Sequence, residues 1–219
     1  MKFKIDLKIF LFFLLFYFTK QIELYMLIII FAIFHELGHL IVGLLLGMKP
    51  NKLELKPYGL SLSFKILPED FNKKIRNGNL MEIKKIIVAL AGPIINLILI
   101  IIFIGLEIDN KIICIYSNLV LLLFNLLPIY PLDGGRILKG ILHIILGKRK
   151  SERYINAISY IMILIITAIT SIIILKVKNI SIIIILIVLW IMVIKEDTYY
   201  KRKEKIYDLI EKSIENNSN

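Results

Sequence analysis

The stretch Phe34-His35-Glu36-Leu37-Gly38-His39-Leu40 places two imidazoles and a carboxylate inside an apolar run that extends from Leu24 to Gly47. This run is predicted to be a membrane helix, because about 20 apolar residues are enough to cross the hydrocarbon core. An ionised side chain at the centre of such a helix costs about 2.5–3.5 kcal/mol even on the lenient insertion scale. The polar residues of this stretch are therefore expected to have a function.

The spacing within the stretch indicates what that function is. His35 and His39 are four residues apart, so on a helix they share one face and can bind one metal ion. Glu36 follows the first histidine and lies beside that face, where it can accept or donate a proton. The pattern predicts a two-histidine metal site with an adjacent acid–base group.

The composition of the whole chain is that of a polytopic membrane protein, since 58% of its 219 residues are hydrophobic. A net charge of +11 would suit a nucleic-acid-binding protein. The basic residues lie in the connections between apolar runs, however, which argues against nucleic acid as a partner and is typical of the positive-inside rule. Cys114 is the only cysteine, so an internal disulfide and cysteine-based zinc sites are excluded.

The apolar runs predict an all-α polytopic membrane protein with about six transmembrane helices. The basic N-terminus and the run after it resemble a signal peptide, but no small-residue cleavage site follows, so this run is expected to be a retained span. The predicted spans are residues 7–19, 24–47, 84–106, 112–130, 154–175 and 179–195.

The distribution of basic residues predicts the orientation. Six spans place both termini on one side, and only four of the 28 lysines and arginines then fall on the other: Lys20, Lys111, Lys176 and Lys178. A multi-pass cell-membrane protein with both termini in the cytoplasm is therefore expected. Residues 1–195 would form the transmembrane domain, with its core at about 24–145, and residues 196–219 a cytoplasmic tail with a short amphipathic helix.

The connection after the second span, residues 48–83, contains the main strand signal. Polar and apolar residues alternate from Lys52 to Phe64 and are interrupted once, at Pro57-Tyr58-Gly59. This pattern predicts a small β-hairpin after the second helix. Its edge could hold an extended substrate by β-strand addition, and a plain surface hairpin is the alternative.

Two residues are candidates for a third metal ligand. A catalytic zinc site takes three protein ligands. Asp133 follows the break from Pro128 to Pro131 at the end of the fourth span, and this break lets it turn inward. His35 lies about 17 Å along its helix from the outer end, near mid-depth, which favours Asp133. His143 is expected at the cytoplasmic end of its segment rather than at the metal.

Three sequence blocks together carry a family resemblance: residues 35–39, Ala91-Gly92-Pro93-Ile94-Ile95-Asn96, and residues 125–136. With these blocks in this order inside apolar segments, the chain resembles the site-2 protease family of intramembrane zinc metalloproteases (peptidase family M50). The hairpin is similar to that of the sporulation branch of this family. That branch is typified by stage IV sporulation protein FB, which removes the pro-segment of a precursor sigma factor.

The resemblance implies a zinc metalloendopeptidase acting near the cytoplasmic membrane face. By analogy, one zinc ion per chain would be held by His35, His39 and Asp133, with Glu36 as general base. The implied substrate is a membrane-associated protein such as a pro-sigma factor, and a regulatory membrane partner or a homo-oligomer would be compatible with the resemblance. It also implies supporting or substrate-binding roles for Asn96, Asn125, Pro131, Pro57, Tyr58 and Gly59.

Two other classes of protein were compared with this interpretation. A divalent-metal transporter would use the histidines and aspartate as a transit site, and would be expected to have further carboxylates along its path and inverted repeats. The sequence shows neither. A catalytically inactive homologue acting as a membrane scaffold would be expected to lack Glu36 or a metal ligand, and all of these are present. The sequence therefore favours the protease.

Overall fold

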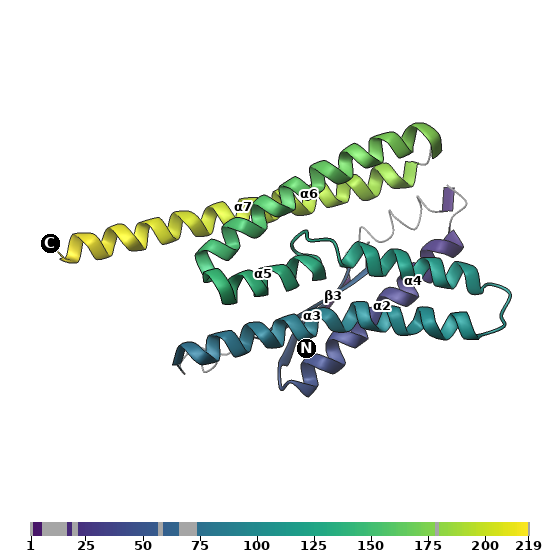
Figure 1. Ribbon diagram of the computed structural model, residues 1–219, viewed down its shortest axis with the longest axis horizontal. Helices are drawn as coiled ribbons and strands as arrows, with labels where there is room; N and C mark the ends of the chain where they lie inside the picture. Colours follow the sequence, from purple (N-terminus) through teal and green to yellow (C-terminus); the bar gives the residue numbers. More distant parts are fainter. Residues whose placement is uncertain are drawn as a thin grey trace.

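The computed structural model describes residues 2–5, 17–18, 22–56, 59–65, 74–177 and 180–218. Most of these residues are helical, and long helices run nearly side by side along the length of the molecule (Figure 1). The helices are α2 (Ile22–Leu45), α3 (Lys74–Gly105), α4 (Lys111–Asn125), α5 (Asp133–Leu146), α6 (Lys148–Val177) and α7 (Ile180–Ser218). The strands are β1 (Lys2–Ile5), β2 (Lys49–Lys56) and β3 (Gly59–Lys65).

Helices α2, α3 and α4 pack together around one hydrophobic cluster. Phe31 and Ala32 of α2 meet Cys114 and Leu121 of α4 in this cluster. Gly38 allows α2 and α3 to approach closely, because a Cβ at this position would meet the backbone of the opposite helix. Small residues serve the same purpose in other membrane helix pairs.

Helices α6 and α7 form an antiparallel pair with a second hydrophobic cluster (Figure 1). Ile163 of α6 and Leu189 and Val193 of α7 are buried there. Ile129 and Leu132, from the loop between α4 and α5, complete the cluster. The loop that precedes α5 is therefore held by α6 and α7 rather than by α2.

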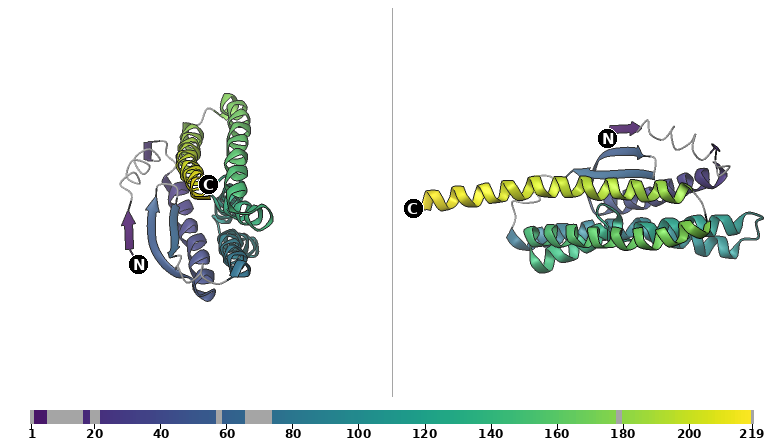
Figure 2. Two further views of the ribbon diagram at one scale, coloured as in Figure 1. Left: turned by 90° about the vertical axis from the view of Figure 1, so that its left-hand side faces the viewer. Right: turned by 90° about the horizontal axis from the view of Figure 1, so that it is seen from above.

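The three strands form one sheet in the order β1-β2-β3 beside α2 (Figure 2). Strands β2 and β3 are antiparallel, with an irregularity between Pro50 and Lys52, and β1 pairs in parallel with β2. Phe64 of β3 packs on α2 at Gly43, where a Cβ would collide with its ring. The sequence analysis did not predict β1, and residues 57 and 58 of the expected turn lie outside the described residues.

Three of the described helices are long and apolar enough to cross a membrane: Ile22–Leu45, Asn79–Gly105 and Lys148–Leu175. The shorter helix α4 is also apolar. The expected span 112–130 is interrupted, since α4 ends at Asn125 before the prolines and α5 starts at Asp133. Most of the expected span 7–19 lies outside the described residues.

Helix α7 continues through the expected boundary between the last span and the tail at residue 195. Its 39 residues contain neither glycine nor proline, so nothing in the backbone chemistry ends the helix where the apolar residues end. The C-terminal half of α7 projects beyond the other helices (Figures 1 and 2). The polarity of the sequence changes at residue 195 while the secondary structure does not.

Candidate metal centre

The two histidines of α2 point into the protein one helical turn apart. His35 and His39 are each 3% exposed, and their rings lie edge to face with centroids 4.7 Å apart. Their Nε2 atoms are separated by 3.1 Å. Both imidazoles therefore direct the same nitrogen at one point, as the four-residue spacing predicts.

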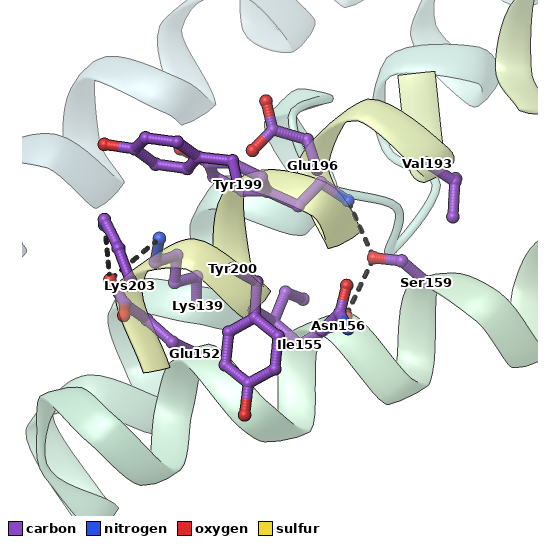
Figure 3. A pocket seen from close by; sticks show the side chains of 11 residues that line it. Lys139, Glu152, Ile155, Asn156, Ser159, Val193, Glu196, Tyr199, Tyr200 and Lys203 are labelled. Atoms are coloured by element: carbon purple, nitrogen blue, oxygen red, sulfur yellow. Dashed lines mark hydrogen bonds and ion pairs between the residues drawn. The ribbon is translucent and has the colours of Figure 1, made fainter. Parts of the chain in front are cut away.

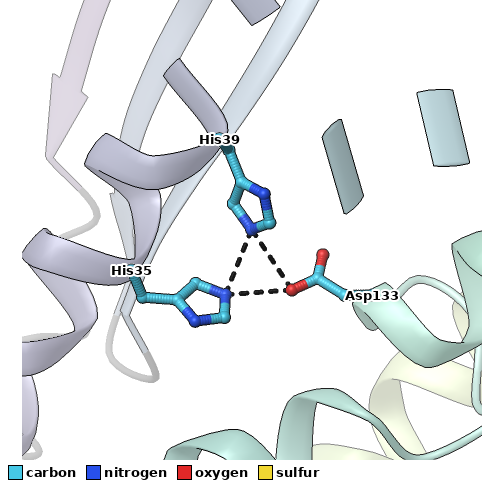
Figure 4. A group of neighbouring side chains, drawn as sticks. All are labelled: His35, His39 and Asp133. Carbon is cyan, nitrogen blue, oxygen red and sulfur yellow. Dashed lines mark hydrogen bonds and ion pairs between the residues drawn. The ribbon is translucent and has the colours of Figure 1, made fainter. Parts of the chain in front are cut away.

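Asp133, the first residue of α5, directs its carboxylate to the same point (Figure 4). Its Oδ2 lies 2.9 Å from His35 Nε2 and 3.2 Å from His39 Nε2. The start of α5 packs tightly against the preceding loop, because a Cβ on Gly134 or Gly135 would collide with the loop backbone. The two glycines thus allow the helix to begin where Asp133 reaches the histidines.

The three ligand atoms match the geometry of a tetrahedral zinc site. Ligand bonds of 2.0–2.2 Å at tetrahedral angles put neighbouring ligand atoms about 3.3–3.6 Å apart. The observed separations of 2.9, 3.1 and 3.2 Å lie just below that range. In the described part of the chain, His35, His39 and Asp133 are the one group of three His, Cys, Asp or Glu residues close enough to share a metal.

Gly92 of α3 leaves the space beside these atoms open. A Cβ built at Gly92 would collide with Nε2 of both His35 and His39. Any other residue at this position would therefore occupy the space into which the histidine nitrogens point. The backbone of α3 forms a cradle over the site that a methyl group would fill.

The other nitrogen of each histidine also has a partner on α3. His39 Nδ1 lies 2.6 Å from the Val88 carbonyl oxygen and donates its hydrogen to it, which leaves Nε2 free to bind a metal. His35 Nδ1 lies 3.2 Å from the amide nitrogen of Asn96.

The Asn96 side chain is fully buried, and its Oδ1 has no hydrogen-bond partner among the described residues. Turning the amide by 180° about its last side-chain bond would let Oδ1 accept from His35 Nδ1–H. That orientation satisfies the buried oxygen and leaves His35 Nε2 free for a metal. The amide of Asn96 is thus suited to support a metal-bound His35.

Three further residues predicted from the sequence lie on α2, at the end of α4 and in the loop before α5. Glu36 is half-buried on α2, next to His35. Asn125 ends α4, where its Nδ2 donates to the Leu121 carbonyl at 3.0 Å. Pro131 follows a cis peptide bond in the loop before Asp133.

The other candidates are His143 and the residues of the expected turn. His143 Nδ1 lies 3.7 Å from Glu82 Oε1, and this histidine is not part of the group of three ligands. Gly59 begins β3, while Pro57 and Tyr58 lie outside the described residues.

Sequence reasoning missed the contributions of Val88 and Gly92. A backbone carbonyl has no sequence signature, so nothing could have indicated Val88. Gly92 stands in one of the three sequence blocks, but the block by itself gives this glycine no role at the site. Its position next to a proline within an apolar run was the available signal.

Comparisons with known proteins give consistent results. Residues 111–169 match the model of the family described as peptidase family M50. A zinc metalloprotease of Methanocaldococcus jannaschii is 32% identical over 139 residues, which are 59% of this chain and 37% of that protein. A Synechocystis protein, named provisionally as a zinc metalloprotease, is 35% identical over 127 residues, 52% of this chain and 30% of that protein. The matches thus span about a third of the length of these curated relatives.

The fold is shared with a solved structure, the site-2 protease from Methanocaldococcus jannaschii. The superposition has a TM-score of 0.66 and covers 90% of this chain and 91% of the other, at 24% sequence identity. The two chains therefore have the same overall arrangement of helices.

Proposed function

We propose that this chain belongs to the site-2 protease family and is an intramembrane zinc metalloprotease. The observation that carries the proposal is the triangle of His35, His39 and Asp133 atoms, which has the dimensions of a zinc site on a helix apolar enough to span a membrane. The match to peptidase family M50 and the similarity to zinc metalloproteases support the same activity.

The proposed cofactor is one zinc ion per chain, held by His35 Nε2, His39 Nε2 and Asp133 Oδ2. The donor set of two imidazoles and a carboxylate is one that zinc prefers, and the carboxylate offsets part of the metal's charge at this depth. When bound, zinc would supply Lewis acidity that lowers the pKa of a bound water to about 7 and polarises the scissile carbonyl.

The chain's own residues would position these groups and move the proton. Val88 and Asn96 hold the two imidazoles with Nε2 directed at the metal position. Glu36, beside His35, would take a proton from the attacking water and deliver it to the leaving amine. The peptide bond is thereby hydrolysed without a covalent enzyme intermediate.

The proposed substrate is a membrane-associated protein, cleaved near the cytoplasmic face. A transmembrane helix hides its carbonyls in backbone hydrogen bonds, so the substrate must be extended before attack. Strand β1 covers one edge of β2 and β3 covers the other, so in the described part of the sheet β3 has an edge available for strand addition. Asn125, Pro131 and the turn at residues 57–59 would help hold that strand.

The proposed topology has six spans with both termini in the cytoplasm and a tail after residue 195. The excess of basic residues on the terminal side supports it. Fusion of green fluorescent protein or alkaline phosphatase after residue 219 tests it. We expect the fusion to green fluorescent protein to be fluorescent and the fusion to alkaline phosphatase to be inactive. An active phosphatase fusion would place the C-terminus outside the cell.

Co-expression with a membrane-tethered pro-sigma factor, the substrate of the sporulation branch, tests the activity. The wild type should release the processed factor. Glu36→Gln should keep its zinc and lose cleavage, because only the proton acceptor is removed. Cleavage that persists in a zinc-loaded Glu36→Gln variant would contradict the proposed mechanism.

Zinc content tests the ligand set separately. Asp133→Asn should lose most of its zinc, while His143→Ala should retain the full amount and serves as the matched control. If Asp133→Asn kept its zinc and His143→Ala lost it, His143 would be the third ligand and the proposed site would be wrong.

A further inference from the structure

A cavity of about 450 Å³ lies beside the metal centre, with His39 in its wall. Two glutamates, Glu82 and Glu152, are the acidic residues that line it. Its lining also contains five basic residues, more than twice the number of acidic ones, and we refer to it as the cationic chamber. These are Lys85, Arg136, Lys139, Lys148 and Lys203.

The glutamates neutralise only part of the positive charge of the lining. Glu82 Oε1 lies 2.6 Å from Lys85 Nζ. Glu152 Oε1 is shared between two lysines, with Lys203 Nζ at 2.9 Å and Lys139 Nζ at 3.7 Å (Figure 3). These two carboxylates thus serve three ammonium groups, and the charge of Glu196, which is not part of the lining, also attracts Lys139.

The other two cations of the chamber have no carboxylate of their own. Arg136 Nη1 lies 3.9 Å from Asp133 Oδ1, a carboxylate that the proposed function assigns to zinc. Lys148 makes no ion pair with any residue in the part of the chain that the structure describes. The residues that line the chamber therefore include more cations than carboxylates, beside the candidate metal centre.

Lys139 is the most confined of these cations. Its side chain is 24% exposed, and its ammonium lies 4.4 Å from the centre of the Tyr130 ring. Burial lowers the pKa of Lys139, which means that its charge is costly in this environment. A carboxylate entering the chamber would offset that cost, and a charge-assisted hydrogen bond is stronger where water is scarce.

The basic residues of α5 are arranged outward from the metal centre. Arg136 and Lys139 follow Asp133 by three and six residues, which is a rise of about 4.5 and 9 Å along the helix. An extended peptide advances about 3.3 Å per residue. A substrate strand leaving the metal along α5 would pass both cations within about three residues of the cleaved bond.

We propose that the cationic chamber binds acidic side chains of the substrate, so that the enzyme prefers peptide segments with Asp or Glu within about three residues of the cleaved bond on the chamber side. This inference rests on the proposed protease function. A lipid phosphate has related chemistry, but His39 is part of the chamber wall, so a bound headgroup would block the substrate's route to the metal.

Binding of a labelled peptide to the full-length Glu36→Gln variant tests the chamber without requiring turnover. The probe is a fluorescein-labelled hexapeptide with three glutamates, compared with the same peptide carrying three glutamines. We expect the glutamate peptide to bind about tenfold more tightly, and Lys139→Gln in the same background to remove most of that difference. Lys150→Gln, an exposed lysine outside the chamber, should leave it intact.

Cleavage of a membrane-tethered reporter adds a second measurement. The reporter with flanking Glu residues should have the highest kcat/KM, followed by the Gln reporter and then the Lys reporter. The difference should arise mainly from KM. In Lys139→Glu this order should be reversed, so that the Lys-flanked reporter has the highest kcat/KM. Zinc content and thermal stability of each variant show whether it is folded, and if Lys139→Glu is not, the comparison is made with Lys139→Gln.

The results separate failure of this inference from failure of the proposed function. If no reporter is cleaved but the glutamate peptide still binds in a Lys139-dependent way, the chamber is supported and the protease assignment is wrong. If reporters are cleaved but both peptides bind equally, the inference is wrong.

The lipid alternative gives its own result. Vesicles of phosphatidylglycerol, but not of phosphatidylcholine, would raise Tm only when Lys139 is present, and the peptides would show no charge preference. That combination would overturn the inference in favour of a lipid phosphate.

Discussion

His35 Nε2 and Asp133 Oδ2 lie 2.9 Å apart although 98 positions separate them in the chain. The hydrophobic clusters next to them are different. His35 is on α2, which packs through Phe31 on α4, whereas Asp133 follows Leu132, which packs on α6 and α7. The candidate metal centre therefore lies between two hydrophobic clusters, and its geometry depends on how well each cluster is packed.

The first prediction concerns the open space above the histidines. Gly92→Ala should remove most of the bound zinc while the protein remains folded, because the added methyl group occupies the space between the two Nε2 atoms. Zinc per chain, measured by atomic absorption on the purified protein, checks this.

Gly105→Ala is the matched control for this substitution. It lies at the end of the same helix, where an added Cβ meets nothing within 4 Å. It should keep its zinc and gain slightly in stability, since alanine is the better helix former. Full zinc occupancy in Gly92→Ala would show that the metal does not occupy this space.

The second prediction concerns the amide behind His35. Asn96→Leu should weaken zinc affinity about 10–100-fold, because His35 loses the group that orients its ring. Competition with a chelator of known affinity measures the change.

Asn118→Leu serves as the comparison for Asn96. Asn118 is also a fully buried asparagine on an apolar helix, but its amide donates to the Cys114 carbonyl, whereas the Asn96 amide contacts His35. It should alter stability and leave zinc affinity unchanged. Equal zinc affinities in the two variants would show that Asn96 does not support zinc binding.

The third prediction concerns the hydrophobic cluster next to Asp133. Ile163→Ala leaves a cavity in the cluster that holds Ile129 and Leu132, at a cost of roughly 2–5 kcal/mol. Because the loop before Asp133 is held by this cluster, zinc should also dissociate faster. Ile161→Ala removes a side chain that is 57% exposed on the same helix and should change neither property. A large loss of stability with normal zinc release would separate the cluster from the metal centre.

The fourth prediction concerns pH and the start of the tail. Burial raises the pKa of Glu196, although Lys139 and Lys195 act against this. Because the unfolded carboxyl titrates near pH 4.3, the folded protein binds this proton more tightly, and Glu196 lowers stability as pH rises through its raised pKa. Glu196→Gln should therefore raise Tm at pH 8, and this gain should disappear below about pH 4.

Asp197, the next residue, should have the opposite effect on stability at high pH. Burial acts to raise the pKa of Asp197, but hydrogen bonds from Lys201, Asn156 and Tyr160 outweigh it and lower that pKa. Its stabilising effect is present above the unfolded pKa of about 3.9 and is lost as pH falls through the lower folded value. Asp197→Asn should thus lower Tm at pH 8. Tm shifts of the same sign in both variants would contradict these environments.

The sequence carries the parts of the site that depend on local periodicity. The spacing of His35 and His39 predicts their shared face, and the proline break predicts that Asp133 can turn inward. The contributions of Val88 and Gly92 depend on the register of α3 against α2, which no local pattern reveals. The cationic chamber has the same origin, since Lys85, Arg136 and Lys203 lie on three different helices, α3, α5 and α7, and meet only through packing.

The secondary structure is likewise predicted by local sequence pattern in some places and not in others. Alternation of polar and apolar residues indicates strands between Lys52 and Phe64. Strand β1 is only four residues long and pairs with a segment about 50 residues away, so its sequence has too little pattern to distinguish it from a basic N-terminus. The extent of α7 was missed because hydrophobicity reports where a membrane ends and not where a helix does.

The unbroken helix α7 has a mechanical consequence. Its 39 residues span about 58 Å, nearly twice the roughly 30 Å hydrocarbon thickness. In the proposed orientation, Lys203 lies about 12 Å beyond the membrane boundary on a rigid arm, so a 10° change in tilt moves it by about 2 Å. Helices adjust their tilt when bilayer thickness changes. The thickness of the surrounding lipid would then affect the position of Lys203 in the chamber, and membrane composition would influence the proposed proteolysis without any ligand.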